Sequence, residues 1–115
     1  MTDIRKLTKL IDKFRNERDW KQFHNAKDMA LSLVLEAAEV MEHFQWKNAK
    51  EMVEHLRARK VEVADELADV LYWVLLMSHD FKIDIGKALK EKLKKQAKKY
   101  PVHKAKGRHT KYTEL

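Results

Sequence analysis

The chain has 115 residues, of which 25 are Lys or Arg and 18 are Asp or Glu, so its formal net charge is +7. This length fits one domain with its own core, and two Gly with one Pro leave little material for tight β-turns, so we predict an all-α fold. The absence of Cys excludes a disulfide framework and a thiolate metal site, and without a membrane-length apolar run or a signal-peptide pattern we expect a cytoplasmic protein that contacts no membrane.

Helical periodicity begins at the amino terminus, where Thr2 is a candidate cap for a helix that runs through Glu17. Its apolar stripe consists of Ile4, Leu7, Ile11 and Phe14. The following segment, 18–25, breaks the helical period and concentrates aromatic side chains. Its members Trp20, Phe23 and His24 either fill the core or sandwich a flat heterocycle, and the residues alone leave both interpretations open.

A second helix is predicted from Asn25 or Asp28 to about Phe44, and it carries Glu36 and Glu39 three residues apart. Side chains at this spacing are neighbours on a helix. The rest of the helix is apolar on nearly every face, which is typical of a buried helix. Burying two carboxylates costs several kcal/mol per ion unless a partner compensates them, and a cation is the natural partner.

The same arrangement returns further along the chain. After a connector at 45–48 and a short helix at 49–57 with Met52, Val53 and Leu56 inward, a helix from Val61 to Ser78 carries Glu66 and Asp69, again three apart. Pairing the two acidic faces would bring four carboxylates together in a dry place, an oxygen-rich site that suits Mg²⁺. The alternative is that these acids pair with Lys and Arg, but their duplication on two apolar helices favours the metal site.

The last third of the chain is basic. We predict that Asp84 caps a helix from Ile85 to Lys99, which Tyr100-Pro101 ends. Most of its Lys residues must form a solvated face, although one or two could serve a polyphosphate. We therefore expect a helical domain at 1–101 and a basic tail at 102–115.

The predicted helices carry more apolar surface than one chain of four helices can cover. Self-association about a two-fold axis is the simplest solution, so we expect at least a homodimer. The surplus includes Trp46, Tyr72, Trp73, Leu75 and Leu76.

Five motifs follow one another along nearly the whole chain. They are Glu17-Arg18-Asp19-Trp20-x-Gln22-Phe23-His24, Glu36-x-x-Glu39, Phe44-Gln45-Trp46-Lys47, Asp65-Glu66-Leu67-Ala68-Asp69-Val70-Leu71, and Tyr100-Pro101-Val102-His103 with the ending Lys111-Tyr112-Thr113-Glu114-Leu115. Together they resemble the all-α nucleoside triphosphate pyrophosphohydrolases of the MazG-like superfamily, and within it the short dCTP pyrophosphatase branch.

This resemblance implies a four-helix-bundle-like MazG-type fold, assembled as a dimer or a dimer of dimers. It also implies a Mg²⁺-dependent hydrolase that clears unwanted nucleotides by cutting between the α- and β-phosphates, with dCTP or a modified dCTP as substrate. The metal ligands would be Glu36, Glu39, Glu66 and Asp69, and Glu39 would also accept the proton of the attacking water. The substrate-binding positions would be Trp20, His24, Trp46 and Trp73 near the base, with Lys92 at the phosphates and Gln96 where relatives often have Asn.

Three other interpretations compete with this one. The first keeps the chemistry but takes dUTP or a broad range of deoxynucleotides as substrate. The second is a non-catalytic module that binds nucleic acid through its basic tail and last helix, which leaves the buried acids unexplained, so we regard nucleic acid as an unlikely partner. The third is a di-iron bundle, but such bundles use Glu-x-x-His motifs, and no Glu in this chain has His three residues later.

Overall fold

The structure, a computed structural model, describes residues 3–115 as helices joined by short connections, with no strand among them. The predicted all-α class is therefore confirmed. The chain divides into two compact units, Met1–Lys82 and Ile83–Leu115, each of which is described by itself. In the described part of the chain, no helix has both the length and the apolar character needed to cross a bilayer.

The first unit begins with α1 (Ile4–Glu17), which packs against α4 (Lys60–Asp80). Asp3 caps α1, because its side chain accepts a hydrogen bond from the backbone N–H of Lys6 at 3.0 Å. The predicted cap, Thr2, lies outside the described residues. A 3₁₀ turn, η1 (Lys21–Phe23), then leads the chain to the next helix.

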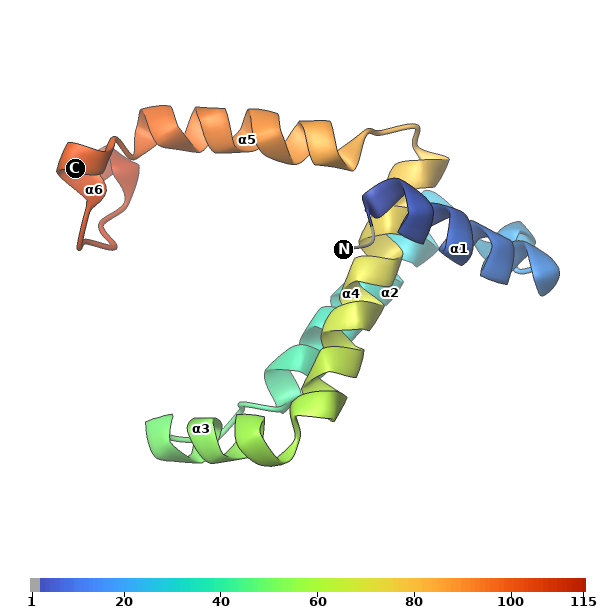
Figure 1. Cartoon of the computed structure of the whole chain (residues 1–115), viewed down its shortest axis with the longest axis horizontal. Helices are drawn as coiled ribbons and strands as arrows, with labels where there is room; N and C mark the ends of the chain where they lie inside the picture. Colours follow the sequence, from blue (N-terminus) through green and yellow to red (C-terminus); the bar gives the residue numbers. More distant parts are fainter. Residues whose placement is uncertain (1–2) are drawn as a thin grey trace. The chain divides into compact units, whose positions relative to one another are not determined.

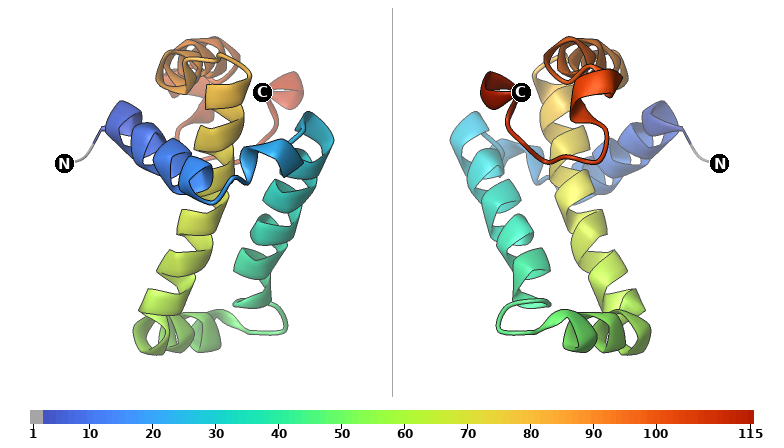
Figure 2. Two further views of the ribbon diagram at one scale, coloured as in Figure 1. Left: turned by 90° about the vertical axis from the view of Figure 1, so that its right-hand side faces the viewer. Right: turned by 90° about the vertical axis from the view of Figure 1, so that its left-hand side faces the viewer.

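The centre of this unit is an antiparallel pair of helices, α2 (Ala26–Glu42) and α4, which lie side by side (Figures 1 and 2). Asn25 caps α2 by accepting a hydrogen bond from the backbone N–H of Asp28 at 2.8 Å. At the other end of the pair, α3 (Ala49–Ala58) connects the two helices and begins with a capping box between Asn48 and Glu51. The fully or nearly buried apolar side chains are Met29, Val63, Leu75 and Leu76.

The apolar surplus predicted for the second and third long helices is present in the single chain, although Leu75 and Leu76, which were counted in it, are buried. Many apolar side chains of α2 and α4 are exposed, because each helix uses mainly one face against the other. These side chains are Leu31, Val34, Leu35, Met41, Val61, Leu67 and Leu71. On α3, likewise, Val53 and Leu56 were expected to point inward but are 58% and 42% exposed.

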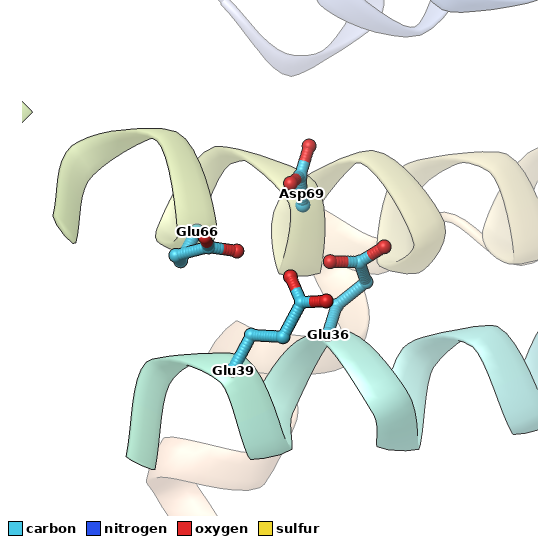
Figure 3. A group of neighbouring side chains, drawn as sticks. All are labelled: Glu36, Glu39, Glu66 and Asp69. Carbon is cyan, nitrogen blue, oxygen red and sulfur yellow. The ribbon is translucent and has the colours of Figure 1, made fainter. Parts of the chain in front are cut away.

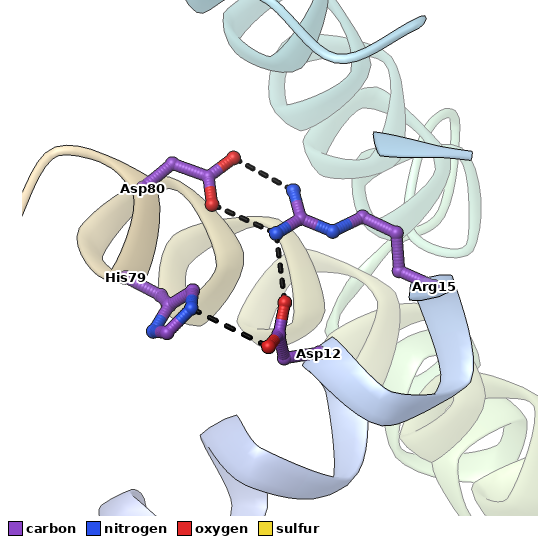
Figure 4. Close-up of polar contacts among 4 residues, drawn as sticks. All are labelled: Asp12, Arg15, His79 and Asp80. Atoms are coloured by element: carbon purple, nitrogen blue, oxygen red, sulfur yellow. Dashed lines mark hydrogen bonds and ion pairs between the residues drawn. The ribbon is translucent and has the colours of Figure 1, made fainter. Parts of the chain in front are cut away.

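A buried ion-pair network fixes α1 to the end of α4 (Figure 4). Arg15, which is fully buried, donates two hydrogen bonds to Asp80, at 2.7 and 2.8 Å, and one to Asp12 at 2.8 Å. His79 lies 3.6 Å from the other oxygen of Asp12. The hydrogen bonds from Arg15 lower the pKa of Asp80, which therefore stays ionised opposite the guanidinium.

The second unit contains α5 (Ile85–Lys99), α6 (Val102–Ala105) and a final 3₁₀ turn, η2 (Tyr112–Glu114). Asp84 caps α5 as predicted, accepting a hydrogen bond from the backbone N–H of Lys87 at 3.0 Å. The tail folds back within this unit, where the rings of Tyr100 and Tyr112 meet edge to face at 5.9 Å. The proposed domain boundary at residue 101 stays a prediction.

Candidate metal and nucleotide site

Four carboxylates meet between α2 and α4 (Figure 3). Glu36 and Glu39 come from α2, Glu66 and Asp69 come from α4, and one oxygen from each lies within 4.8 Å of the others. The predicted convergence is confirmed, because a spacing of three residues on each helix places both pairs on the facing sides. Since the helices are antiparallel, Glu36 stands with Asp69 at one end of the cluster and Glu39 with Glu66 at the other.

The surroundings of this acid cluster are wetter than expected. Glu39 and Asp69 are exposed in the single chain, whereas Glu36 and Glu66 are half-buried. The Oε2 atoms of Glu36 and Glu66 are nevertheless buried and have no hydrogen-bond partner. None of the ion pairs found within residues 3–115 involves these four acids, which contradicts the alternative that Lys and Arg neutralise them.

The electrostatics of the cluster fit a cation. Hydrogen bonding with Glu39, together with desolvation, raises the pKa of Glu66 to about 7. Burial and the neighbouring carboxylates also raise the pKa of Glu36. Without a metal, the raised pKa values favour protonation of Glu36 and Glu66, which reduces the repulsion among the carboxylates. A divalent ion would replace these protons. A ligand set made only of oxygens suits a hard ion such as Mg²⁺.

An aromatic pocket of about 360 Å³ adjoins the Asp69 end of the cluster. On α4, Tyr72 and Trp73 follow Asp69 by about one turn. The pocket is lined by Asp69 and by Phe14, Trp20, His24, Tyr72 and Trp73. The sequence had predicted three of these aromatic or imidazole positions, whereas Phe14 and Tyr72 had been assigned to apolar packing. Their spacing could have indicated this role. Phe14 precedes Trp20 across the turn that ends α1, and Tyr72 follows Asp69 by three residues on the same helix.

His24 has a distinctive setting within this pocket. Its ring meets Trp73 edge to face at 5.2 Å, and its Nδ1 atom is buried without a hydrogen-bond partner. Burial and the nearby charge of Arg15 lower the pKa of His24, so the ring is neutral at pH 7. A neutral imidazole offers one donor and one acceptor, which is the equipment needed to read the edge of a planar ring.

A second pocket, of about 390 Å³, adjoins the other end of the cluster. It is lined by Glu39, Glu42, His43, His55 and Glu66. This pocket was not predicted from the sequence, because His55 lies on a short helix that was expected to be mostly exposed.

The remaining predicted substrate-binding residues are Trp46, Lys92 and Gln96. Trp46 lines neither pocket and is 91% exposed. Its backbone has a φ of 68°. Lys92 and Gln96 lie on α5, in the second unit. Their roles stay predictions.

With this geometry in view, comparison with known proteins identifies the family. The profile of the MazG-like family matches residues 31–115. This chain belongs to the MazG-like family. The MazG-type fold and the predicted family are thereby confirmed.

Known proteins of this MazG-like type match over most of the chain. It is 36% identical to dCTP pyrophosphatase 1 of Rattus norvegicus and 35% identical to that of Homo sapiens, matching along its whole length and over 67% of each relative. A crystal structure of a pyrophosphatase from Archaeoglobus fulgidus is 36% identical, with a TM-score of 0.82 over 88% of this chain and 94% of that one. These similarities agree with the predicted dCTP pyrophosphatase branch.

Proposed function

We propose that this chain is a Mg²⁺-dependent nucleoside triphosphate pyrophosphohydrolase that converts dCTP, or a base-modified dCTP, to the monophosphate and pyrophosphate. The observation that carries the proposal is the meeting of four carboxylates beside an aromatic pocket. The broader class, a nucleotide pyrophosphatase, has independent support from the family and from the named relatives. Such an enzyme would remove unwanted nucleotides from the cytoplasmic pool.

Glu36, Glu39, Glu66 and Asp69 would hold the metal, which agrees with the buried, unpartnered oxygens of Glu36 and Glu66. When bound, Mg²⁺ supplies charge neutralisation for the phosphates and lowers the pKa of water. Glu39 is exposed at one end of the cluster, where its carboxylate can accept the proton of the attacking water. The water oxygen then bonds to the α-phosphorus as the bond to the β-phosphate oxygen breaks.

The base would lie in the aromatic pocket. Trp20 and Trp73 provide stacking faces, and the free Nδ1 of His24 provides a hydrogen bond to the base edge. The proposal keeps Trp46 as a further substrate contact, with Lys92 and Gln96 at the phosphates, on the strength of the family resemblance.

A homodimer, or a dimer of dimers, forms part of the same proposal. Seven large apolar side chains of α2 and α4 are exposed in the single chain, and exposed apolar surface of this kind favours association when it is contiguous. A second copy of the chain is the partner that would cover them symmetrically.

The test is a panel of natural and 5-substituted nucleotides, with pyrophosphate and phosphate measured separately. We expect Mg²⁺-dependent pyrophosphate release, lost in Glu36→Ala and Asp69→Ala and kept in Glu54→Ala, an exposed acid on α3 that serves as the matched control. Release of single phosphates would contradict the proposal. Preferred turnover of dUTP, or equal turnover of nucleotides with many bases, would contradict the proposed substrate but not the proposed reaction.

A further inference from the structure

The two ends of the acid cluster open onto pockets of different chemistry. The Asp69 end meets rings, whereas the end formed by Glu39 and Glu66 meets the imidazoles of His43 and His55 and the carboxylate of Glu42. A nucleotide has the same polarity, with a flat base at one end and a chain of phosphates at the other. The difference between the pockets therefore gives a direction to a substrate that spans the cluster.

The histidine pair joins two elements. His43 caps the carboxyl end of α2, His55 lies in the last turn of α3, and the Nδ1 atom of His43 is 2.8 Å from the Nε2 atom of His55. Since a neutral imidazole has one N–H, sharing a hydrogen at this contact leaves one outer nitrogen as donor and the other as acceptor. The pair can thus bind both an ionised phosphate oxygen and a protonated one.

Two basic side chains, Lys47 and Arg59, lie near the same end. After burial, which is the largest cause, they contribute to lowering the pKa of His55. Arg59 forms an ion pair with Glu62 at 3.3 Å. Lys47 is half-buried, and none of the ion pairs within residues 3–115 includes it. A lysine without an ion-pair partner is available to a phosphate, with which it forms a charge-assisted hydrogen bond.

We infer that His43, His55 and Lys47 form the subsite for the pyrophosphate half of the substrate. This inference rests on the proposed function. The nucleotide then lies with its base among Trp20, His24 and Trp73, its α-phosphate at the acid cluster, and its β- and γ-phosphates against the histidine pair. The exposed carboxylate of Glu42 repels a free polyanion, so the ligand of the subsite is pyrophosphate as its magnesium complex, whatever the base.

Product inhibition separates the two halves of the site. In Lys47→Met and His55→Gln we expect the inhibition constant for pyrophosphate to rise roughly tenfold, because each change removes a hydrogen bond to a charged group. The constant for the nucleoside monophosphate product should stay unchanged. Trp73→Ala should show the reverse pattern, and Lys50→Met, an exposed lysine on α3, should alter neither constant.

Calorimetric titration of the intact protein with magnesium pyrophosphate supplies a reading that is independent of turnover. His55→Gln could loosen α3, so its helix content is checked by circular dichroism, and Lys47→Met tests the subsite without touching the histidine contact. Unchanged pyrophosphate binding in both variants would overturn the inference. A wild-type protein that releases no pyrophosphate from any nucleotide would overturn the proposed function instead, and the titration would still decide the subsite.

Discussion

The carboxyl group of Glu66 shows how the site holds negatively charged groups close together. Its neighbour Glu39 lies close enough to share a proton with it, which raises its pKa to about 7. One buried oxygen of the same group has no partner. In water the favourable response would be for the two acids to move apart, but α2 and α4 hold them in place. The helices therefore impose a repulsion that only protons or a bound cation can relieve.

Glu66→Gln tests this conflict directly. The amide keeps the shape of the side chain but removes its charge, so we expect the melting temperature at pH 8 without metal to rise. The stabilisation that Mg²⁺ gives the wild-type protein should disappear, and pyrophosphate release should fall by at least about 100-fold. Thermal denaturation with and without Mg²⁺ measures the first two effects. Equal stabilisation of both proteins by Mg²⁺ would show that Glu66 holds no ion.

At the scale of the elements, the contact between α1 and α4 decides where the aromatic pocket forms. α1 ends just before the segment with Trp20 and His24, so its position sets theirs. The network of Arg15 with Asp80 and Asp12 fixes that position. Removing one partner of a buried pair leaves the other charge uncompensated, which is more costly than the pair is worth in itself.

Asp80→Asn should therefore lower the free energy of unfolding at pH 7 by about 3–5 kcal/mol. The pKa of Asp80 is lowered in the folded state, so its contribution is present above the unfolded value of 3.8 and is lost as the pH falls through the folded value. Urea denaturation of both proteins at pH 7 and pH 3 should show the difference shrinking at the lower pH. A difference that is independent of pH would contradict the ionised pair.

The local features of these elements could be predicted from the sequence, whereas the buried pair could not. Asn25 and Asp84 each cap a helix by accepting a hydrogen bond from the backbone N–H three residues later. Glu36 and Glu39 lie on one side of α2 because of helix geometry alone. Arg15 is different, because its burial depends on Asp80, 65 residues further along. Likewise, the contact between His55 and His43 depends on the direction in which α3 leaves the end of α2. The periodicity within α3 does not indicate that direction.

At the scale of the whole molecule, the main feature is the set of apolar side chains that the single chain leaves exposed. Leu35 on α2 and Leu71 on α4 are exposed on helices whose facing sides carry the acid cluster. This agrees with the prediction from the sequence that these helices carry more apolar surface than one chain can cover. A second chain would supply the missing neighbours and would leave the acid cluster intact, since that cluster is complete within one chain.

Sedimentation equilibrium should therefore give a mass above the 13.7 kDa of one chain. Leu35→Glu should shift the protein toward the monomer, because a charge on the apolar surface opposes its burial. Leu10→Glu, at an equally exposed position on α1, is the control and should leave the mass unchanged. A wild-type protein that sediments as a monomer at micromolar concentration would contradict the assembly.

Both acid pairs belong to one helical hairpin, which begins at Ala26 and ends at Asp80, whereas Phe14, Trp20 and His24 precede it. Three of the pocket residues are thus encoded outside the stretch that carries both acid pairs, whereas Tyr72 and Trp73 come from within it. Under the proposed function, substitutions in the amino-terminal stretch would reshape part of the base pocket without touching a proposed metal ligand. Divergence among relatives should therefore accumulate before residue 25 faster than it does between the two acid pairs.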